Sequence, residues 1–258
     1  MAESAIREWG WRIPFLVGCL IVPFIFFLRR KLEETEEFSA RRHHLEMHQV
    51  FRTLLGNWQV VIAGMLMVAM TTTAFYLITV YAPTFGKKVL MLSASDSLLV
   101  TLLVAISNFI WLPVGGALSD RFGRKPVLIA MTLLALATSY PTLTLLAQAP
   151  SFSMMLSVLL WLSFLYGLYN GAMIPALTEI MPSEVRVAGF SLAYSLATAV
   201  FGGFTPVMST ALIEYTGDKA SPGYWMSFAA VCALLATLYL YRRRAVTLQN
   251  TVKSEGAA

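Results

Sequence analysis

Charged side chains of both signs are concentrated in one short turn, and their types suit ion pairing rather than bond-breaking chemistry. The turn reads Gly116-Ala-Leu-Ser-Asp-Arg-Phe-Gly-Arg-Lys-Pro126. Asp120 lies at a predicted helix end beside Arg121 and Arg124, so we expect its carboxylate to be paired. Gly116 permits close helix packing and Gly123 permits a turn with positive φ, which together would hold these charges in place.

A second charged segment lies further along the chain and is expected to meet the first. It reads Glu179-Ile-Met-Pro-Ser-Glu-Val-Arg-Val-Ala-Gly189. Glu179 and Arg186 could join Asp120, Arg121 and Arg124 in one network at a single face of the protein. Such a network would hold that face closed in one state and break in another, which makes it a candidate gate. The alternative is that these charges are isolated surface ions.

Polar and aromatic side chains interrupt the apolar stretches of the chain, where a path for a polar solute would need them. The candidates for lining such a path are Tyr76, Asn108, Trp111, Tyr166, Tyr169, Asn170 and Tyr194. The alternative is hydrogen bonding between helices, which contributes about 0.6 kcal/mol per contact in membranes. Asn108 and Asn170 are costlier to bury, and both interpretations stay open for them. Gly167 and Gly171 favour close packing, with a soft backbone near Pro175.

The middle of each apolar stretch lacks Lys, Arg, Asp and Glu. Asp96, Glu179 and Glu214 all fall near the ends of stretches. An anion in hydrocarbon needs Arg, Lys or a helix N-terminus beside it, and proton coupling needs a titratable group in the path. We therefore expect this chain to supply polar lining and a gate, without the main charge sites.

Composition places the chain in a membrane. Of its 258 residues, 57% are hydrophobic and 13% are charged, and the mean hydropathy is +0.68. Soluble domains carry about 25% charged residues, so these values exclude a disordered chain, a nucleic-acid-binding module and an ordinary soluble enzyme. Cys19 and Cys232 lie in apolar stretches and support neither a disulfide framework nor a metal site, and no cofactor is expected.

Seven stretches are long and apolar enough to cross a bilayer, which predicts an all-α membrane protein with seven transmembrane helices. A span needs about 20 mostly apolar residues, and unpaired backbone groups in lipid force it to be helical. The predicted spans are residues 11–28, 60–82, 97–118, 127–147, 153–177, 187–213 and 224–241. The resulting parts are a first span within 1–28, a linker at 29–57, a six-helix bundle at 58–241 and a tail at 242–258. Linker residues His43, His44 and His48 could bind a metal, although a solvated cytoplasmic linker is the simpler interpretation.

The distribution of basic residues indicates the orientation. Fourteen of the 19 Lys and Arg residues lie within 29–52, in the turns that hold Arg124 and Arg186, or after residue 241. The positive-inside rule places that side in the cytoplasm, so the N-terminus is expected outside and the C-terminus inside. A chain that starts outside, with no earlier span to carry it there, is expected to be N-terminally incomplete. The alternative is an inverted first span, which would leave basic residues 29–31 on the wrong side.

Several of these segments resemble one family of membrane proteins. The turn at 116–126 resembles the G-x-x-x-D-R-x-G-R-[KR] loop of the major facilitator superfamily, and 182–189 resembles its P-x-x-x-R-x-x-G turn. Residues 9–15 resemble the start of the sixth helix in the metabolite–proton symporters of that superfamily. Closer similarity to bacterial citrate–proton symporters lies in 69–76, 106–113, 169–173, 189–198, 201–203, 216–219 and 221–223.

This resemblance implies a fold and an activity. The fold would be a major-facilitator-type bundle that runs from the sixth helix, at residues 1–28, to the twelfth, with the first five helices absent. The activity would be proton-coupled uptake of citrate or a related tricarboxylate across the bacterial inner membrane by a multi-pass symporter that is not an enzyme. Its partners would be a small organic anion, a proton, the lipid membrane and the N-terminal half of the fold, with no nucleic acid.

Two alternatives to this activity stay open. One is a symporter for another organic acid, such as 2-oxoglutarate or shikimate, because citrate rests on resemblance alone. The other is a truncated membrane fragment that does not transport, either alone or as part of an assembly. A membrane enzyme is disfavoured because the sequence offers no metal cluster and no intramembrane nucleophile with a base.

Overall fold

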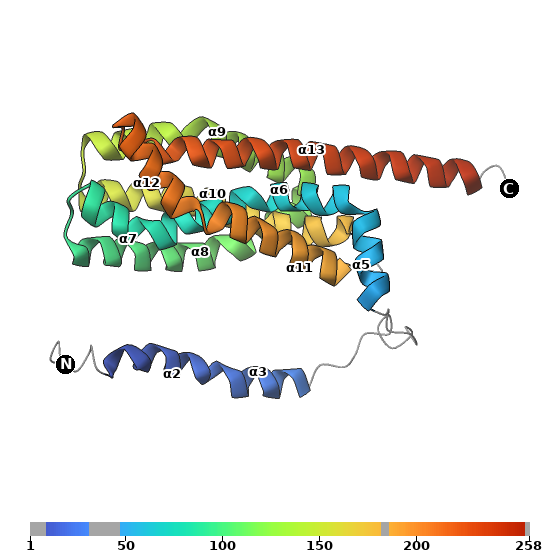
Figure 1. The fold of residues 1–258 in the computed structure, drawn as a ribbon, viewed down its shortest axis with the longest axis horizontal. Helices are drawn as coiled ribbons and strands as arrows, with labels where there is room; N and C mark the ends of the chain where they lie inside the picture. Colours follow the sequence, from blue (N-terminus) through green and yellow to red (C-terminus); the bar gives the residue numbers. More distant parts are fainter. Residues whose placement is uncertain (1–8, 31–46, 182–185, 256–258) are drawn as a thin grey trace. The chain divides into compact units, whose positions relative to one another are not determined.

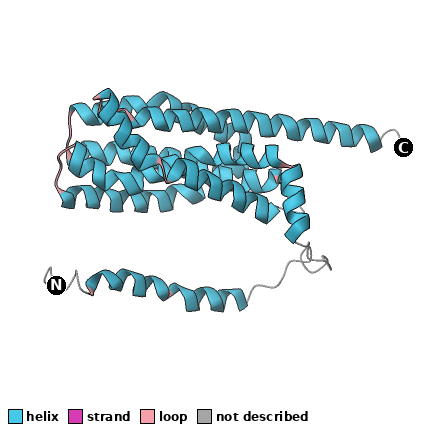
Figure 2. Cartoon of the chain, in the orientation of Figure 1, coloured by secondary structure: helices cyan, strands magenta, loops and turns pink. Residues whose placement is uncertain are grey.

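The computed structural model of the chain describes residues 9–30, 47–181 and 186–255. The regular structure of these residues is helical (Figures 1 and 2), as the apolar stretches predict. The chain divides into two units, Met1–Glu46 and Met47–Ala258, and each is described by itself. His43 and His44 of the proposed linker lie outside the described residues, whereas His48 lies on an exposed helix surface.

The first unit contains a short apolar helix that is interrupted. Its elements are η1 (Gly10–Arg12), α2 (Ile13–Cys19) and α3 (Ile21–Arg30). A turn at Leu20 separates α2 from α3, and its N–H bonds to the Val17 carbonyl at 3.1 Å. The apolar stretch Ile13–Leu28 is shorter than the roughly 20 residues of a full span. The first of the seven predicted spans therefore stays a prediction.

The second unit contains six helices that are long and apolar enough to cross a membrane. They cover Trp58–Val89, Ala94–Phe122, Arg124–Gln148, Phe152–Ile180, Arg186–Thr216 and Pro222–Arg243. Each contains one predicted span, so these six predictions are confirmed. The elements in chain order are α5 (Met47–Gly56), α6 (Trp58–Phe75), η2 (Tyr76–Tyr81), α7 (Ala82–Thr84), η3 (Phe85–Val89), α8 (Ala94–Phe122), α9 (Arg124–Gln148), α10 (Phe152–Ile180), α11 (Arg186–Ala197), η5 (Thr198–Gly202), α12 (Thr205–Thr216) and α13 (Pro222–Glu255).

Local signals in the sequence set where these helices begin. The side chains of Ser93 and Ser151 accept hydrogen bonds from the first-turn N–H groups of α8 and α10, at 2.9 and 3.2 Å. Gly123 separates α8 from α9 with a φ of 90°, the positive value that its position in the turn predicts. These short turns place consecutive spans antiparallel to one another.

Two of the six spans are not regular α-helices. The segments η2, η3 and η5 are π-helical, so they interrupt the first span of the bundle and the span formed by α11 and α12. Pro83 and Pro206 follow η2 and η5, and neither has an N–H to continue an i→i−4 pattern. The sequence pointed instead to a soft backbone near Pro175, yet α10 runs through Pro175 without interruption.

The core of the bundle lies around α6 and α10, which are the most buried of the six spans. α6 packs against α10, α11 and α13, and α10 packs against α8 and α9. Figure 1 shows these helices side by side along the length of the bundle. α8 and α10 share the most extensive helix–helix interface, because glycines let their backbones approach closely.

Candidate functional site

Arg124 joins the ends of three helices at the turn between α8 and α9. Its guanidinium forms an ion pair with Asp120 at 2.5 Å and another with Glu179 at 3.2 Å. It also donates a hydrogen bond to the hydroxyl of Ser119 at 2.6 Å. Asp120 and Ser119 belong to α8 and Glu179 belongs to α10, so one side chain at the start of α9 ties α8, α9 and α10 together. We call Ser119, Asp120, Arg124 and Glu179 the charge cluster.

Other residues of the predicted gate do not join the charge cluster. Arg121 lies over the ring of Phe122, 5.5 Å from its centroid. Arg186 is exposed at the start of α11, and neither arginine forms an ion pair within the described residues. The Gly116 backbone lies close to α10, since a Cβ atom on Gly171 would meet its nitrogen at 2.6 Å, but Gly116 itself has room for a Cβ atom, which would lie 3.8 Å from its nearest neighbour. The neighbouring Gly115 is the position that excludes a side chain, since its Cβ would lie 2.6 Å from the Leu168 Cα atom.

The path-lining candidates fall into two groups, and one of them forms a cluster in the middle of the bundle. Tyr166 and Asn170 lie on α10, Tyr76 opens η2, and Tyr194 lies on α11. The Asn170 amide donates a hydrogen bond to the Tyr166 hydroxyl at 3.3 Å. The phenol of Tyr194 lies within electrostatic range of those of Tyr76 and Tyr166. We call these four residues the tyrosine cluster.

Aromatic packing and a glycine position the tyrosine cluster. The ring of Phe75 lies 5.9 Å from the rings of both Tyr76 and Tyr166 and so connects α6 to α10. Gly202 of η5 leaves room for the Tyr76 ring, because a Cβ atom there would lie 2.8 Å from it. The hydroxyl of Thr72 donates to the Ala197 carbonyl at 3.3 Å, which joins α6 to α11. Two interrupted spans therefore meet at this cluster.

Hydrogen-bonding capacity is left over inside the tyrosine cluster. Tyr166 is 6% exposed and Asn170 is 4% exposed, whereas Tyr76 and Tyr194 are half-buried. The Asn170 Oδ1 atom is buried and has no hydrogen-bond partner in the described part of the chain. A buried amide oxygen without a partner costs free energy, which points to a partner that arrives in another state or with a ligand.

The remaining candidates have packing roles in this structure. Asn108 accepts a hydrogen bond from Ser163 at 2.7 Å across the α8–α10 interface. Trp111 packs edge-on against Phe164, with the ring centroids 4.9 Å apart. Tyr169 is fully buried, and its hydroxyl donates to the Met67 carbonyl at 2.7 Å. The structure therefore brings four of the seven candidates together and places the other three in helix–helix contacts.

The sequence-based selection missed Ser163 and Phe75. Ser163 precedes Tyr166 by three positions and Asn170 by seven, so helical spacing places all three on one face of α10. That spacing could have identified Ser163. Nothing in the sequence marked Phe75, because its role depends on the ring of Tyr166 from another helix.

The chemistry available to these two clusters is hydrogen bonding and ion pairing. Within the described residues no group of three His, Cys, Asp or Glu side chains could hold a metal ion. The acidic and basic residues of the six spans lie near their ends, as in the charge cluster, and the tyrosine cluster is uncharged. The arrangement can form hydrogen bonds to a polar solute and ion pairs between helix ends, but the described residues offer no titratable carboxylate or cation at mid-depth.

Comparison with known proteins gives a family and several relatives. The family model described as Major Facilitator Superfamily matches residues 4–199 and 93–257. The chain is 88% identical to a citrate-proton symporter of Klebsiella pneumoniae over 97% of its own length and 56% of the relative's. It is 59% identical to a citrate-proton symporter of Salmonella typhi, over 94% of this chain and 56% of that protein.

A more distant relative is a putative proline/betaine transporter of Staphylococcus aureus strain COL, which is 28% identical over 93% of this chain and 52% of its own length. The chain thus spans about half the length of the curated relatives that it matches. No solved structure matches the chain significantly.

Proposed function

The chain belongs to the Major Facilitator Superfamily, and we propose that it forms part of a proton-coupled symporter that takes up citrate across the bacterial inner membrane. The observation that carries this proposal is the 88% identity to a citrate-proton symporter over nearly the whole chain. An identity this high over nearly the whole chain supports a shared fold and a shared substrate. Citrate is the substrate that we propose first, and other tricarboxylates are the next candidates.

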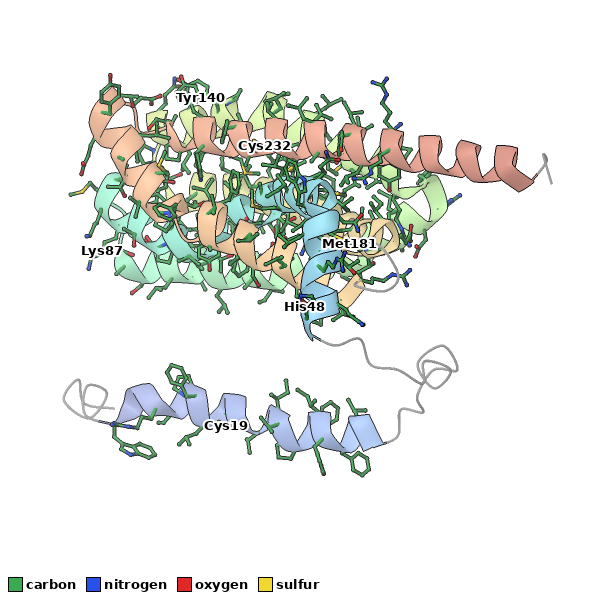
Figure 3. All side chains as sticks on the ribbon, turned by 45° about the vertical axis from the view of Figure 1, so that its right-hand side comes forward. Cys19, His48, Lys87, Tyr140, Met181 and Cys232 are labelled. Carbon is green, nitrogen blue, oxygen red and sulfur yellow. The ribbon has the colours of Figure 1, made fainter. Side chains whose placement is uncertain are left out.

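The proposed topology has seven spans, with the N-terminus outside and the C-terminus inside. The alternation of the six helices supports it, because Arg121, Arg124 and Arg186 fall at the same end of the bundle as α5. Lys87 and Lys88 fall at the opposite end, where Figure 3 labels Lys87. The end with more basic residues would face the cytoplasm. The interrupted helix at Ile13–Leu28 would be the first of the seven spans, and residues 29–57 would be the linker.

The charge cluster would act as the cytoplasmic gate. Arg124 holds the ends of α8, α9 and α10 through partly exposed partners, and such ion pairs contribute only about 0–1 kcal/mol. A contact this weak can form in one state and break in the other at little cost. That property suits a two-state element better than a strong buried pair would.

The tyrosine cluster would line the path of the substrate. Its phenol groups can donate hydrogen bonds to a carboxylate, and Asn170 Oδ1 can accept one from a substrate hydroxyl. Since citrate carries both carboxylates and a hydroxyl, the cluster matches its chemistry without supplying charge. The cationic groups and the proton site would come from the other half of the fold, across the interface between the two bundles.

The experiment is uptake of labelled citrate by cells without a citrate carrier of their own. One strain would express this chain alone, and another would express it joined to the part of the Klebsiella relative that the chain does not match. We expect uptake by the joined form, abolished by a protonophore and competed more strongly by citrate than by 2-oxoglutarate or shikimate. Absence of uptake by a joined form that is present in the membrane would contradict the proposal.

A second function, a membrane component that does not transport by itself, is favoured for the chain alone by one observation. The six described spans hold no Lys, Arg, Asp or Glu at mid-depth, whereas binding an anion and coupling a proton need them. Under this alternative the cells that express the chain alone would show no uptake. Protonophore-sensitive uptake by those cells would show that the described spans suffice.

A further inference from the structure

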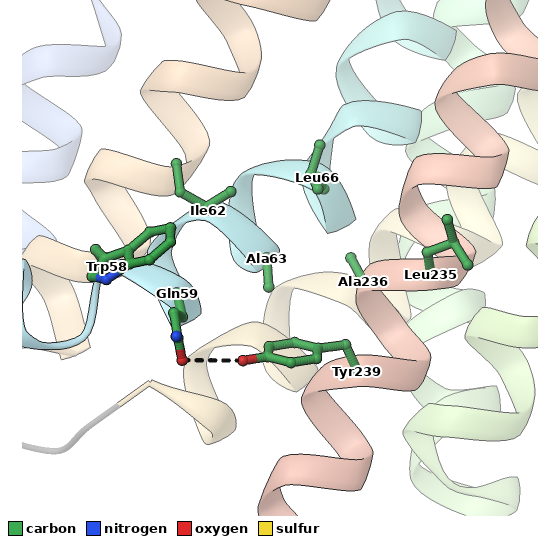
Figure 4. Close-up of a pocket in the computed structure, with 8 residues that line it drawn as sticks. All are labelled: Trp58, Gln59, Ile62, Ala63, Leu66, Leu235, Ala236 and Tyr239. Carbon is green, nitrogen blue, oxygen red and sulfur yellow. Dashed lines mark hydrogen bonds between the residues drawn. The ribbon is translucent and has the colours of Figure 1, made fainter.

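A groove of about 310 Å³ opens on the surface of the bundle between α6 and α13, where α6 begins (Figure 4). It is lined by Trp58, Gln59, Ile62, Ala63, Leu66, Leu235, Ala236 and Tyr239. Most of these side chains are apolar. The polar contact at the groove is a hydrogen bond of 3.3 Å from the Tyr239 hydroxyl to the Gln59 side-chain oxygen. The groove plays no part in either cluster described above.

A second hollow of about 190 Å³ lies on the other side of Trp58 and Ile62, which line both. The other residues of its lining come from α5, α6 and α11 and are all apolar: Leu54, Leu55, Val61, Leu192 and Leu196. Trp58 is 58% exposed and Ile62 is 38% exposed. These two side chains therefore form a ridge with an apolar hollow on each side.

Basic side chains stand at the end of the groove. Leu235 and Tyr239 share one face of α13 with Arg242 and Arg243, which follow Leu235 by seven and eight positions. Arg242 is exposed and Arg243 is half-buried, and Arg52 of the adjacent helix α5 is exposed. Two aromatic side chains of the groove lie near these cations in the chain: Tyr239 precedes Arg242 by three positions and Trp58 follows Arg52 by six. Aromatic residues near the end of a span are typical of a membrane surface.

We propose that the two hollows bind the acyl chains of one anionic phospholipid, whose phosphate lies beside Arg242 and Arg243. The two hollows fit a lipid with two chains astride the Trp58–Ile62 ridge. A basic pocket between transmembrane helices favours an anionic headgroup over a zwitterionic one. A bound phospholipid would contact α5, α6 and α13 together and so stabilise their packing at the end of the bundle that carries the charge cluster. The proposal requires that the bundle lie in a membrane but does not require citrate transport.

The test is native mass spectrometry of the purified full chain in detergent, with added phosphatidylglycerol or phosphatidylcholine that carry identical acyl chains. We expect one phosphatidylglycerol molecule to remain bound to the chain and to raise the melting temperature of the chain. We expect phosphatidylcholine to be retained more weakly. Replacing both arginines, in R242Q/R243Q, should lower the preference for phosphatidylglycerol by about five-fold for each arginine removed. The matched control is K87Q/K88Q, which removes the same charge at the opposite end and should leave the preference unchanged.

A second pair of variants tests the groove itself. Leu235→Trp fills it, and Leu238→Trp places the same side chain on α13 at an exposed position outside the lining. We expect phosphatidylglycerol to be lost from the first variant and retained by the second. Equal retention of both lipids by the unmodified chain, or equal retention of phosphatidylglycerol by both variants, would overturn the proposal. A dimer that only Leu235→Trp dissociates would also overturn it, since a second copy would then occupy the groove.

Discussion

The α8–α10 pair and the α6–α11 pair differ in how their helices meet. α8 and α10 are continuous, and Gly115 brings their backbones into direct contact. Ser163 donates a hydrogen bond to the Asn108 side-chain oxygen across that interface. α6 and α11 instead lead into the π-helical segments η2 and η5, and the tyrosine cluster, with its unpaired Asn170 oxygen, lies beside them.

This difference separates a rigid part of the bundle from an adaptable one. Close glycine packing with satisfied polar groups leaves few alternative arrangements. A π-helical turn carries an extra residue in the hydrogen-bond pattern, and such turns are frequent at functional sites. We infer that α8–α10 serves as the scaffold and that motion belongs to α6 and α11. Solute contact is shared between those two helices and Tyr166 and Asn170, which the scaffold helix α10 presents to them.

The largest effect on stability is expected at the α8–α10 contact. In Gly115→Ala the new Cβ atom would meet the Leu168 backbone at 2.6 Å, and backbone cannot yield as a side chain can. We expect a loss of about 3 kcal/mol or more in the free energy of unfolding, measured in detergent. The matched control is Gly116→Ala, whose Cβ atom has 3.8 Å of clearance and should be tolerated. Equal stability of the two variants would remove the basis for calling this contact the scaffold.

A smaller loss is expected at the α6–α11 contact. In Gly202→Ala the new Cβ atom would meet the Tyr76 ring at 2.8 Å, and the ring can be displaced at a cost of about 1–3 kcal/mol. Citrate uptake by the joined transporter should fall more than stability does, because the tyrosine cluster is disturbed. The double variant Gly202→Ala/Tyr76→Ala should show strong coupling in a double-mutant cycle. Additive effects would show that the glycine does not act through Tyr76.

The hydrogen bond between Ser163 and Asn108 should contribute less again. Ser163→Ala leaves the Asn108 oxygen without this donor, and interhelical bonds in membrane proteins contribute about 0.6 kcal/mol, with a maximum near 1.7. We expect a stability loss in that range, with citrate uptake nearly unchanged. Ser157→Ala, at an exposed serine bonded to the Ser153 carbonyl within its own helix, is the control. A selective loss of uptake in Ser163→Ala would extend the substrate path from the tyrosine cluster into the α8–α10 interface and contradict a purely structural role for this bond.

The smallest effect on stability is expected at the charge cluster. Arg124→Gln should change the free energy of unfolding by about 1 kcal/mol or less, because both carboxylate partners are partly exposed. Uptake should fall clearly, since the ends of α8, α9 and α10 lose their shared contact. Arg121→Gln is the control, because Arg121 lies over Phe122 and outside the cluster. If both variants transported equally, the gate would not depend on the Arg124 ion pairs.

The site was only partly predictable because its helices are apolar on most sides. Hydropathy fixes where a span begins and ends, but a face directed at lipid and a face directed at another helix carry the same residue types. Tyr166 and Tyr169 illustrate this limit, since both were equal candidates for the path. One belongs to the tyrosine cluster, whereas the other donates to the Met67 carbonyl in the core.

The sequence by itself determined six spans and the positive φ of Gly123, because lipid leaves the backbone no partners except its own and glycine tolerates that turn best. Only the tertiary structure decided that Gly115 rather than Gly116 excludes a side chain and that Arg124 rather than Arg121 joins the helix ends. It also decided where the π-helical segments lie. These choices depend on the distance and rotation between helices, which are set by side-chain packing across the bundle and leave no periodic signal in an apolar sequence.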